Sequence, residues 1–256
     1  MSTATALMPT ISIVVPTYRR PEKLARALDS IAQALSQPYE AIVIDDCPDG
    51  SAFAVARQFQ VQYVHKAGRD RGQSASRNIG MALAQGRWLC FLDDDDFFMP
   101  QGLERLLAAA QTSGKVVFGD YQAFNAAARA EVPLAGITLD TLLVCNQIPM
   151  GAFVMERGAV ARQFDTRMRS HEDWDFLLSH ILRSGMQYVP GAVVVIDKTE
   201  NQTTSTEARR RKLFWLDFLS IYARFPASHL STARGHMLAS LGIQMPDGLL
   251  QFNDDI

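Results

Sequence analysis

The sequence predicts an α/β fold in which a mostly parallel central sheet is flanked by helices and followed by C-terminal helices. Short β-branched apolar runs alternate with helical patterns through the first half of the chain. The chain has 256 residues, of which 48% are hydrophobic, so it can bury a full core within one large domain. Polar motifs follow directly after several apolar runs, and in open parallel sheets ligands bind at that carboxyl edge.

The expected elements of the first half alternate between strand and helix. The run ISIVV at 11–15 ends at Pro16 and is typical of a buried strand. Pro21 suits the first turn of a helix, and apolar residues follow it at helical spacing. The remaining predictions are strands at 41–44, 61–65 and 87–92, a short helix around 52–59, and a helix that starts from the polar loop 66–78 and stops near Gly86.

The second half is less regular. The helix at 171–185 has the clearest signals, with acidic residues in its first turn, an apolar side and Gly185 at its end. The other predictions are helices at 101–110, 138–145 and 207–225, strands at 115–121, 151–156 and about 188–196, a short helix after 156, and a patternless loop at 122–137.

Composition limits the partners and the location. A formal net charge of −2 gives no general attraction to nucleic acid, so we expect none as a partner. The three cysteines are far apart without metal-type spacing, which favours reduced thiols in a cytoplasmic protein. The start resembles no signal peptide, and the longest apolar run, 189–196, is too short to span a bilayer. We therefore expect any membrane contact to be peripheral.

The run FLDDDDFFMP at 91–100 places four carboxylates directly after an apolar strand. Two unit charges about 4 Å apart repel by ~1 kcal/mol in water and ~4 kcal/mol at an effective dielectric near 20, so the run needs positive charge nearby. A helix N-cap or solvated turn would explain one residue, such as Asp96. Carboxylates together with phosphates are the ligands that Mg²⁺ and Mn²⁺ prefer, so Asp93, Asp94 and Asp95 favour a metal–phosphate site.

Two further motifs are expected at the same edge of the sheet. Asp45 and Asp46 follow the second strand, where they either cap a turn or bond to a base or ribose. The loop and helix from 66 to 86 supply basic side chains that either face solvent or bind phosphate bidentately. These candidates are Arg69, Arg71 and Arg77, with Asn78 beside the last of them.

Glu172 and Asp173 begin the helix at 171–185. Carboxylates in a first helical turn stabilise the helix dipole by about 0.3–1 kcal/mol, which is a sufficient structural reason for acidic residues there. Asp175 is well explained in this way, and the residues alone leave a catalytic role for the first two open.

Taken together, these motifs resemble glycosyltransferase family 2, the large inverting family with the GT-A fold, a Rossmann-like fold for nucleotide-diphospho-sugar transfer. The resembling segments are ISIVVPTYRRPEKLARALDSI, AIVIDDCPDGS, SASRNIGMALAQGRWLCFLDDDDFFMPQGL and HEDWDFLLSHILRSG. They cover most of 11–105 together with 171–185. The resemblance implies a GT-A domain over 1–205, divided into a nucleotide-sugar-binding half at 11–105 and an acceptor and catalytic-base half at 106–205. A C-terminal helical extension would follow at 206–256.

The resemblance also implies a role for each matching position. Pro16, Thr17 and Tyr18 would surround the nucleobase of a UDP, dTDP or GDP sugar, with Asp46 accepting a hydrogen bond from it and Asp45 beside it. Arg77 and Asn78 would lie near the base and diphosphate. The family's Asp-x-Asp (DXD) signature falls on 93–95, where Asp95 would bind Mn²⁺ or Mg²⁺ and Asp93 and Asp94 would reach ribose, sugar or metal-bound water. Asp173, beside Glu172, would be the base that deprotonates an acceptor hydroxyl in a single inverting displacement.

The family guess for the acceptor is a bacterial surface polysaccharide or glycolipid. Four basic residues at 209–212 precede large apolar residues in the helix at 207–225. This pattern is typical of an interfacial helix near a lipid-linked acceptor, of packing on the core, or of a homodimer contact.

Two other functions stay open. An aspartyl-phosphate phosphatase or phosphotransferase would also use a strand-end aspartate and Mg²⁺, although Phe97 and Phe98 do not match its usual pattern. A nucleotide-sugar-binding subunit without catalysis would retain the donor motifs alone.

Overall fold

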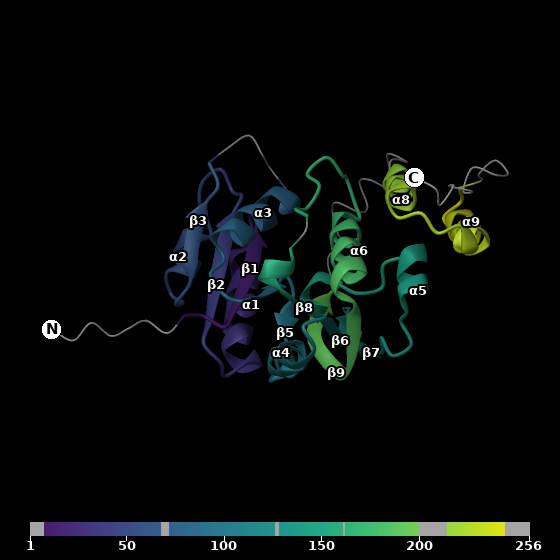
Figure 1. The fold of residues 1–256 in the computed structure, drawn as a ribbon. Coiled ribbons are helices and arrows are strands. Elements are labelled where there is room, and N and C mark those ends of the chain that lie inside the picture. Colours follow the sequence, from purple (N-terminus) through teal and green to yellow (C-terminus); the bar gives the residue numbers. More distant parts are fainter. Residues whose placement is uncertain (1–7, 68–71, 126–127, 161, 200–213, 244–256) are drawn as a thin grey trace.

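The computed structural model describes residues 8–67, 72–125, 128–160, 162–199 and 214–243 (Figure 1). Within these residues, nine strands form one sheet in the order β3-β2-β1-β4-β8-β6-β9-β5, with β7 paired to β6. The strands are β1 (Ile11–Thr17), β2 (Tyr39–Asp45), β3 (Gln62–His65), β4 (Trp88–Phe91), β5 (Phe97–Phe98), β6 (Val116–Phe124), β7 (Arg129–Val132), β8 (Phe153–Glu156) and β9 (Met186–Asp197).

Helices cover the sheet and extend beyond it. The described helices are α1 (Pro21–Ala34), α2 (Phe53–Ala56), α3 (Gln73–Leu83), α4 (Gly102–Ser113), α5 (Leu139–Val144), α6 (Glu172–Ser184), α8 (Phe214–Arg224) and α9 (Ser231–Ser240), with short 3₁₀ turns at Met150–Ala152, Arg157–Ala159 and Ser228–Leu230. Figure 1 shows α8 and α9 beyond α6, at the end of the molecule away from β3 and α2.

The directions of the strands bring their carboxyl ends to one edge. β1 runs parallel to both β2 and β4, and Thr17 lies directly opposite Asp45 in the register. β8 is antiparallel to β4 and to β6, and β9 is parallel to β6, so the end of β9 reaches the same edge as the end of β4. The predicted convergence of strand-end motifs is therefore confirmed.

The predicted fold class is confirmed, with helices flanking a sheet whose longest pairings are parallel. The prediction of a patternless loop at 122–137 is wrong in part, because β6 continues to Phe124 and forms a hairpin with β7. The two-residue strand β5, inside the acidic motif, was not predicted; it forms because Phe97 and Phe98 pair with the last residues of the long strand β9.

The C-terminal helices belong to the same hydrophobic core as the sheet. Phe218, Ile221 and Tyr222 of α8 and Leu238 of α9 are buried in it. Part of the helix predicted at 207–225 thus packs on the core, while its basic residues 209–212 lie outside the described residues. No described helix has the length and apolarity needed to cross a bilayer. The boundary at 205/206 stays a prediction.

Close packing of α3 on β1 leaves no room for a side chain at Gly80. A Cβ at Gly80 would overlap Cγ1 of Val14 and approach its Cγ2 at 2.9 Å. Alanine normally stabilises a helix by about 1 kcal/mol relative to glycine, whereas overpacking a core costs about 1–3 kcal/mol. We expect Gly80→Ala to lower the free energy of unfolding by about 1–2 kcal/mol in urea denaturation. Gly158→Ala is the control, since a Cβ there meets nothing within 4 Å; equal stability of the two variants would contradict this packing.

Candidate active site

The turn after β1 is fixed by one carboxylate of the acidic run. The Thr17 hydroxyl donates to Asp94 Oδ2 at 2.8 Å, and the Tyr18 backbone N–H donates to the same oxygen at 3.2 Å. Arg19, next in the chain, has a left-handed backbone with φ of 56°. A non-glycine residue in this region costs free energy and persists where its surroundings impose it. Asp94 thus holds the Pro16-Thr17-Tyr18 turn in shape, with half-exposed Tyr18 at its surface.

Arg20 supplies positive charge to the acidic run. Its Nη1 lies 2.6 Å from Asp95 Oδ2 and 3.4 Å from Asp94 Oδ1. Burial nevertheless raises the pKa of Asp94 to about 6, and burial and Asp93 raise the pKa of Asp95. The ion pair with Arg20 therefore offsets only part of the effect of burial on these two carboxyls.

The last aspartate of the run contacts the end of β9. Asp96 Oδ1 accepts a hydrogen bond from the Asp197 N–H at 2.9 Å, so Asp96 joins two strand ends and does not act as a helix cap. Arg26 of α1 donates to the Asp95 carbonyl at 2.7 Å and to Asp197 Oδ2 at 2.6 Å. Burial acts to raise the pKa of Asp197, but the hydrogen bonds from Thr199 and Arg26 lower it to about 2. The segment after the last strand is thus tied to the acidic run.

The two aspartates after β2 have different surroundings. Asp45 is fully buried and accepts hydrogen bonds from the N–H groups of Cys47 and Ala52 and from the Tyr63 hydroxyl. It therefore shapes the following loop. Asp46 is half-buried; Lys66 Nζ lies 3.1 Å from its Oδ1, and the Gly72 N–H donates to its Oδ2 at 2.7 Å.

Arg77 connects the acidic run to the start of α6. Its guanidinium is buried, with Nη2 at 2.6 Å from Asp93 Oδ1 and Nη1 at 3.0 Å from Glu172 Oε1. It also lies over the ring of Phe164 at 5.4 Å. The helix α3 thereby joins two carboxylates that are 79 positions apart in the sequence.

The other candidates from the loop and helix at 66–86 do not join this contact. Asn78 exchanges two hydrogen bonds of 2.9 Å with the backbone of Phe164, which fixes the segment leading to α6. Arg69 and Arg71 lie outside the described residues.

Asp173 is the carboxylate whose surroundings best suit proton transfer. Burial and the neighbouring Glu172 raise its pKa to about 7, and Arg77 acts in the opposite direction. Asp173 Oδ1 accepts from the Trp174 N–H at 2.7 Å, and its Oδ2 accepts from Asn146 Nδ2 at 3.1 Å. A base is most effective when its pKa lies near the working pH, so this carboxylate is suited to general-base chemistry.

The acidic run fits a divalent cation that a donor diphosphate completes. Within the described residues, no group of three His, Cys, Asp or Glu side chains is arranged to hold a metal alone. Mg²⁺ usually binds one or two carboxylates together with substrate phosphates and water, so such a group is not required. Burial and the nearby Asp93 raise the pKa of Asp95 although Arg20 pairs with it, and a cation beside this carboxylate would favour its ionised form.

Sequence reasoning missed three residues of this network, namely Arg20, Arg26 and Asn146. Arg20 lies two positions after Tyr18 of the Pro16-Thr17-Tyr18 motif, and that position was a usable signal. Asn146 contacts Asp173 from a segment without any pattern, so nothing in the sequence identified it.

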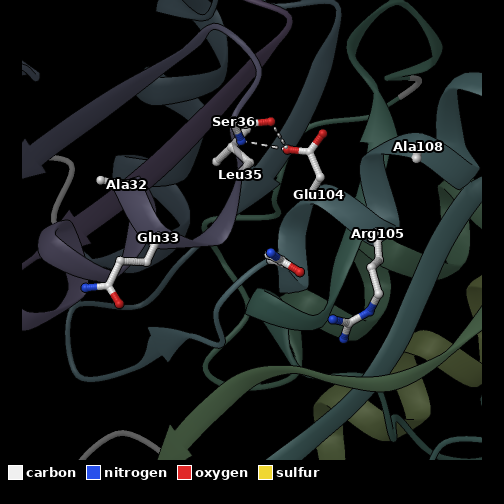
Figure 2. A pocket seen from close by; sticks show the side chains of 8 residues that line it. Ala32, Gln33, Leu35, Ser36, Glu104, Arg105 and Ala108 are labelled. Atoms are coloured by element: carbon white, nitrogen blue, oxygen red, sulfur yellow. Dashed lines mark hydrogen bonds between the residues drawn. The ribbon is translucent and has the colours of Figure 1, made fainter.

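A separate pocket of about 470 Å³ lies between α1 and α4 (Figure 2). Residues near the end of α1 line the pocket. Because α1 has 14 residues, this end lies roughly 20 Å from the start of the helix, which faces the acidic run. Glu104 in this pocket already accepts hydrogen bonds from the N–H and hydroxyl of Ser36 (Figure 2). The pocket is therefore distinct from the candidate site.

Solved structures share this fold at low sequence identity. TarS 1–349 of S. aureus in complex with UDP-GlcNAc superposes with a TM-score of 0.66 and 16% identity, over 91% of this chain and 80% of that one. The mannosyltransferase PcManGT of Pyrobaculum calidifontis, in complex with GDP-Man and Mn²⁺, superposes with a TM-score of 0.64 and 15% identity, over 93% and 74%. At these identities the likeness shows the fold, which is that of GT-A glycosyltransferases.

Sequence relatives and a family profile identify the chain more closely. An uncharacterized glycosyltransferase of Haemophilus influenzae is 32% identical over 184 residues, 66% of this chain and 60% of that protein. The succinoglycan biosynthesis protein ExoO of Rhizobium meliloti is 27% identical over 199 residues, 70% of this chain and 57% of that protein. The matches thus span less than two thirds of either relative. The profile described as glycosyl transferase family 2 matches residues 12–143, over half of the sequence. The chain therefore belongs to glycosyltransferase family 2.

Proposed function

We propose that the protein transfers a sugar from a nucleotide-diphosphate sugar to an acceptor hydroxyl with inversion at the anomeric carbon. The observation that supports this most is the Asp93–Arg77–Glu172 contact, since it joins the acidic run to the helix that carries Asp173. This contact supports a donor site and a base within reach of one another, which a single displacement requires.

Asp173 is the proposed base. It would take the proton of the acceptor hydroxyl as that oxygen attacks the anomeric carbon from the side opposite the diphosphate. A pKa of about 7 lets the carboxylate accept a proton near neutral pH. Glu172 is proposed to hold Arg77 and to raise the basicity of its neighbour, without touching the substrate.

The donor is proposed to bind along the edge formed by the ends of β1, β2 and β4. Pro16, Thr17 and Tyr18 would surround the base, and Asp46 would accept a hydrogen bond from it while Asp45 supports the loop. Arg77 and Asn78 would shape the wall near the diphosphate, Asp93 would face the ribose and sugar, and Asp94 would support this edge by holding the turn after β1. UDP, dTDP and GDP sugars all remain candidates.

Asp95, with Asp93 beside it, is proposed to hold Mn²⁺ or Mg²⁺. Such an ion, when bound, stabilises the negative charge that develops on the leaving diphosphate. Arg20 pairs with Asp95, and we propose that its guanidinium turns to the donor diphosphate when Asp95 binds the metal ion. The Mn²⁺ in the PcManGT complex supports this assignment by similarity of fold.

We propose a bacterial surface polysaccharide or glycolipid as the acceptor, since a relative carries the name of a succinoglycan biosynthesis protein. The acceptor would bind over the half of the domain that carries α5 and α6. A peripheral membrane or homodimer contact through 207–225 stays a proposal for the part of that segment outside the described residues.

A thermal-shift screen tests the donor assignment. UDP, dTDP and GDP and their sugars are added with and without Mn²⁺ or Mg²⁺ at a hundred times the dissociation constant, where one-site binding stabilises by about 2.7 kcal/mol. We expect one nucleotide series to raise the melting temperature by several degrees, and more with the metal than without it.

The screen, combined with assays of turnover and of aspartate phosphorylation, distinguishes the alternatives. Stabilisation by a nucleotide sugar without turnover on any glycan acceptor would indicate a binding subunit. Trapping of a phosphorylated Asp93 would indicate phosphoryl transfer. Absence of any nucleotide-dependent shift would contradict the proposed donor class.

A further inference from the structure

Asn146, just after α5, has an amide whose orientation is fixed by two neighbours. Its Oδ1 accepts from the Ile148 backbone N–H at 3.1 Å, and its Nδ2 donates to Asp173 Oδ2 at 3.1 Å. A backbone N–H can only donate, so the amide oxygen must face Ile148 and the amide nitrogen must face the carboxylate. Asn146 therefore presents a donor to Asp173.

The end of α5 that leads to Asn146 is held by three other helices. The last carbonyls of a helix have no partner within the helix and need donors from elsewhere. Here the donors are Trp174 Nε1 of α6 to Leu142 O at 2.7 Å, Arg234 Nε of α9 to Leu143 O at 3.0 Å, and the Tyr222 hydroxyl of α8 to Val144 O at 2.7 Å. The C-terminal helices thus fix the segment that carries the amide.

The same helix α8 holds the chain on the other side of the carboxylate. Asp217 Oδ2 accepts from the N–H groups of Arg169 and Ser170 at 3.2 and 2.8 Å and from the Ser170 hydroxyl at 2.8 Å. His171 follows with a left-handed backbone, φ of 60°, directly before Glu172 begins α6. Helix α8 is therefore bonded both to the end of α5, just before Asn146, and to residues 169–170, just before α6.

We propose that Asn146 is a positioning residue for Asp173, and that α8 and α9 hold it against that carboxylate. The inference rests on the proposed function, because it takes Asp173 as the base. A donor on one oxygen favours the ionised form and turns the carboxylate so that the remaining lone pairs can meet an acceptor hydroxyl.

Other charged and titratable groups also act on Asp173. They are Glu172 and Asp93, which disfavour its ionised form, Arg77, which favours it, and the nearby thiol of Cys145. A test must leave these groups in place, so the change has to preserve the size and the outer contact of Asn146.

Asn146→Asp meets that need. One oxygen of the new side chain still accepts from the Ile148 N–H, and the other places a negative charge beside Asp173 where the amide N–H stood. We expect kcat to fall about ten- to a hundredfold while the donor KM stays nearly constant, since the base acts in the chemical step. The acid limb of the pH dependence of kcat should move up by about one unit, because the added charge opposes ionisation of Asp173. Gln111→Glu on the exposed face of α4 is the matched control and should change neither quantity. An unchanged pH profile in Asn146→Asp would overturn the proposal.

A second measurement does not depend on turnover. Asn146→Asp is introduced into the wild type and into the Asp173→Asn variant, and the urea midpoint of each is measured at pH 8. We expect the substitution to lower the midpoint in the wild type and to have much less effect when residue 173 is uncharged. Equal losses in both backgrounds would refute the pairing, even if no donor were found. An active Asp173→Asn variant would instead refute the base, and with it the proposed function.

Tyr222→Phe tests the part played by α8. Loss of the hydroxyl frees the Val144 carbonyl, and we expect kcat to fall about two- to tenfold with an unchanged donor KM. Tyr188→Phe, which removes a hydroxyl bonded to Asp120 on β6, is the control and should leave kcat unchanged. Equal kcat in wild type and Tyr222→Phe would show that α8 does not hold Asn146 in place.

Discussion

Asp173→Asn is expected to lower kcat for sugar transfer by about 10²–10⁴-fold, which is the usual contribution of a positioned base. The amide has nearly the shape of the carboxylate but cannot take the acceptor proton. Donor binding should persist, because the residues proposed to contact the nucleotide are unchanged. Release of nucleoside diphosphate, followed together with the thermal shift by the same donor, measures both quantities.

The same variant should be more stable than the wild type at alkaline pH. The folded-state pKa of about 7 lies above the ordinary value of 3.8, so between these values the native chain binds more protons than the unfolded chain. Stability is therefore lost as pH rises from about 4 to about 7, and the full cost remains above pH 7. At about 1.4 kcal/mol per unit this cost is at most ~4 kcal/mol, less what solvent screens at a half-buried group.

Urea denaturation at pH 5 and pH 8 checks this expectation. Asp173→Asn should gain several tenths of a molar to one molar in midpoint over the wild type at pH 8 and less at pH 5. Asp140→Asn, an exposed carboxylate on α5, is the control and should gain nothing at either pH. A catalytically active variant, or one that is less stable at pH 8, would contradict the assigned role of Asp173.

Asp95→Ala is expected to remove the metal dependence of donor binding and to lower kcat/KM by at least a hundredfold. A metal that stabilises a leaving diphosphate contributes several kcal/mol to the transition state, and each 1.36 kcal/mol is a factor of ten. The change removes a partly exposed ion pair with Arg20, so the fold should lose about 1 kcal/mol or less. Thermal shifts by nucleotide with and without Mn²⁺ measure the first effect directly.

Asp29→Ala provides the control for this experiment. Asp29 is an exposed carboxylate on α1, and its loss should leave both the shift and kcat/KM unchanged. A full Mn²⁺-dependent shift in Asp95→Ala would show that the ion is held elsewhere.

The strands β1, β2 and β4 could be predicted because each carries a short apolar run that is buried on both faces of the sheet, whereas β3 lies at its edge and has no buried residue. The strand β8 was found as an element, but its insertion between β4 and β6 leaves no trace in periodicity. The hairpin of β6 and β7 was missed because its residues from 121 onward are half-buried or exposed, so no apolar alternation marks them.

The residues of the candidate site also divide into those that the sequence predicts and those that it does not. Asp93, Asp94, Asp95 and Asp173 were predicted because carboxylates at strand and helix ends are visible in the sequence. The environments of these carboxylates could not be predicted, because they depend on contacts between distant segments. Asp95 pairs with Arg20, 75 positions away, and Asp173 with Asn146, 27 positions away. Arginines of the protein itself also contact the acidic run, Arg20 at Asp95 and Arg77 at Asp93.

Arg234 bears on how this chain can be recombined with its relatives. Its buried guanidinium donates to the Leu143 carbonyl near the end of α5 and to the Phe225 carbonyl just after α8. A chimera joined at residue 205 would therefore take the Leu143 carbonyl from one parent and the Arg234 guanidinium from the other. Crossovers placed within the first half, for instance after β3, would leave this contact whole.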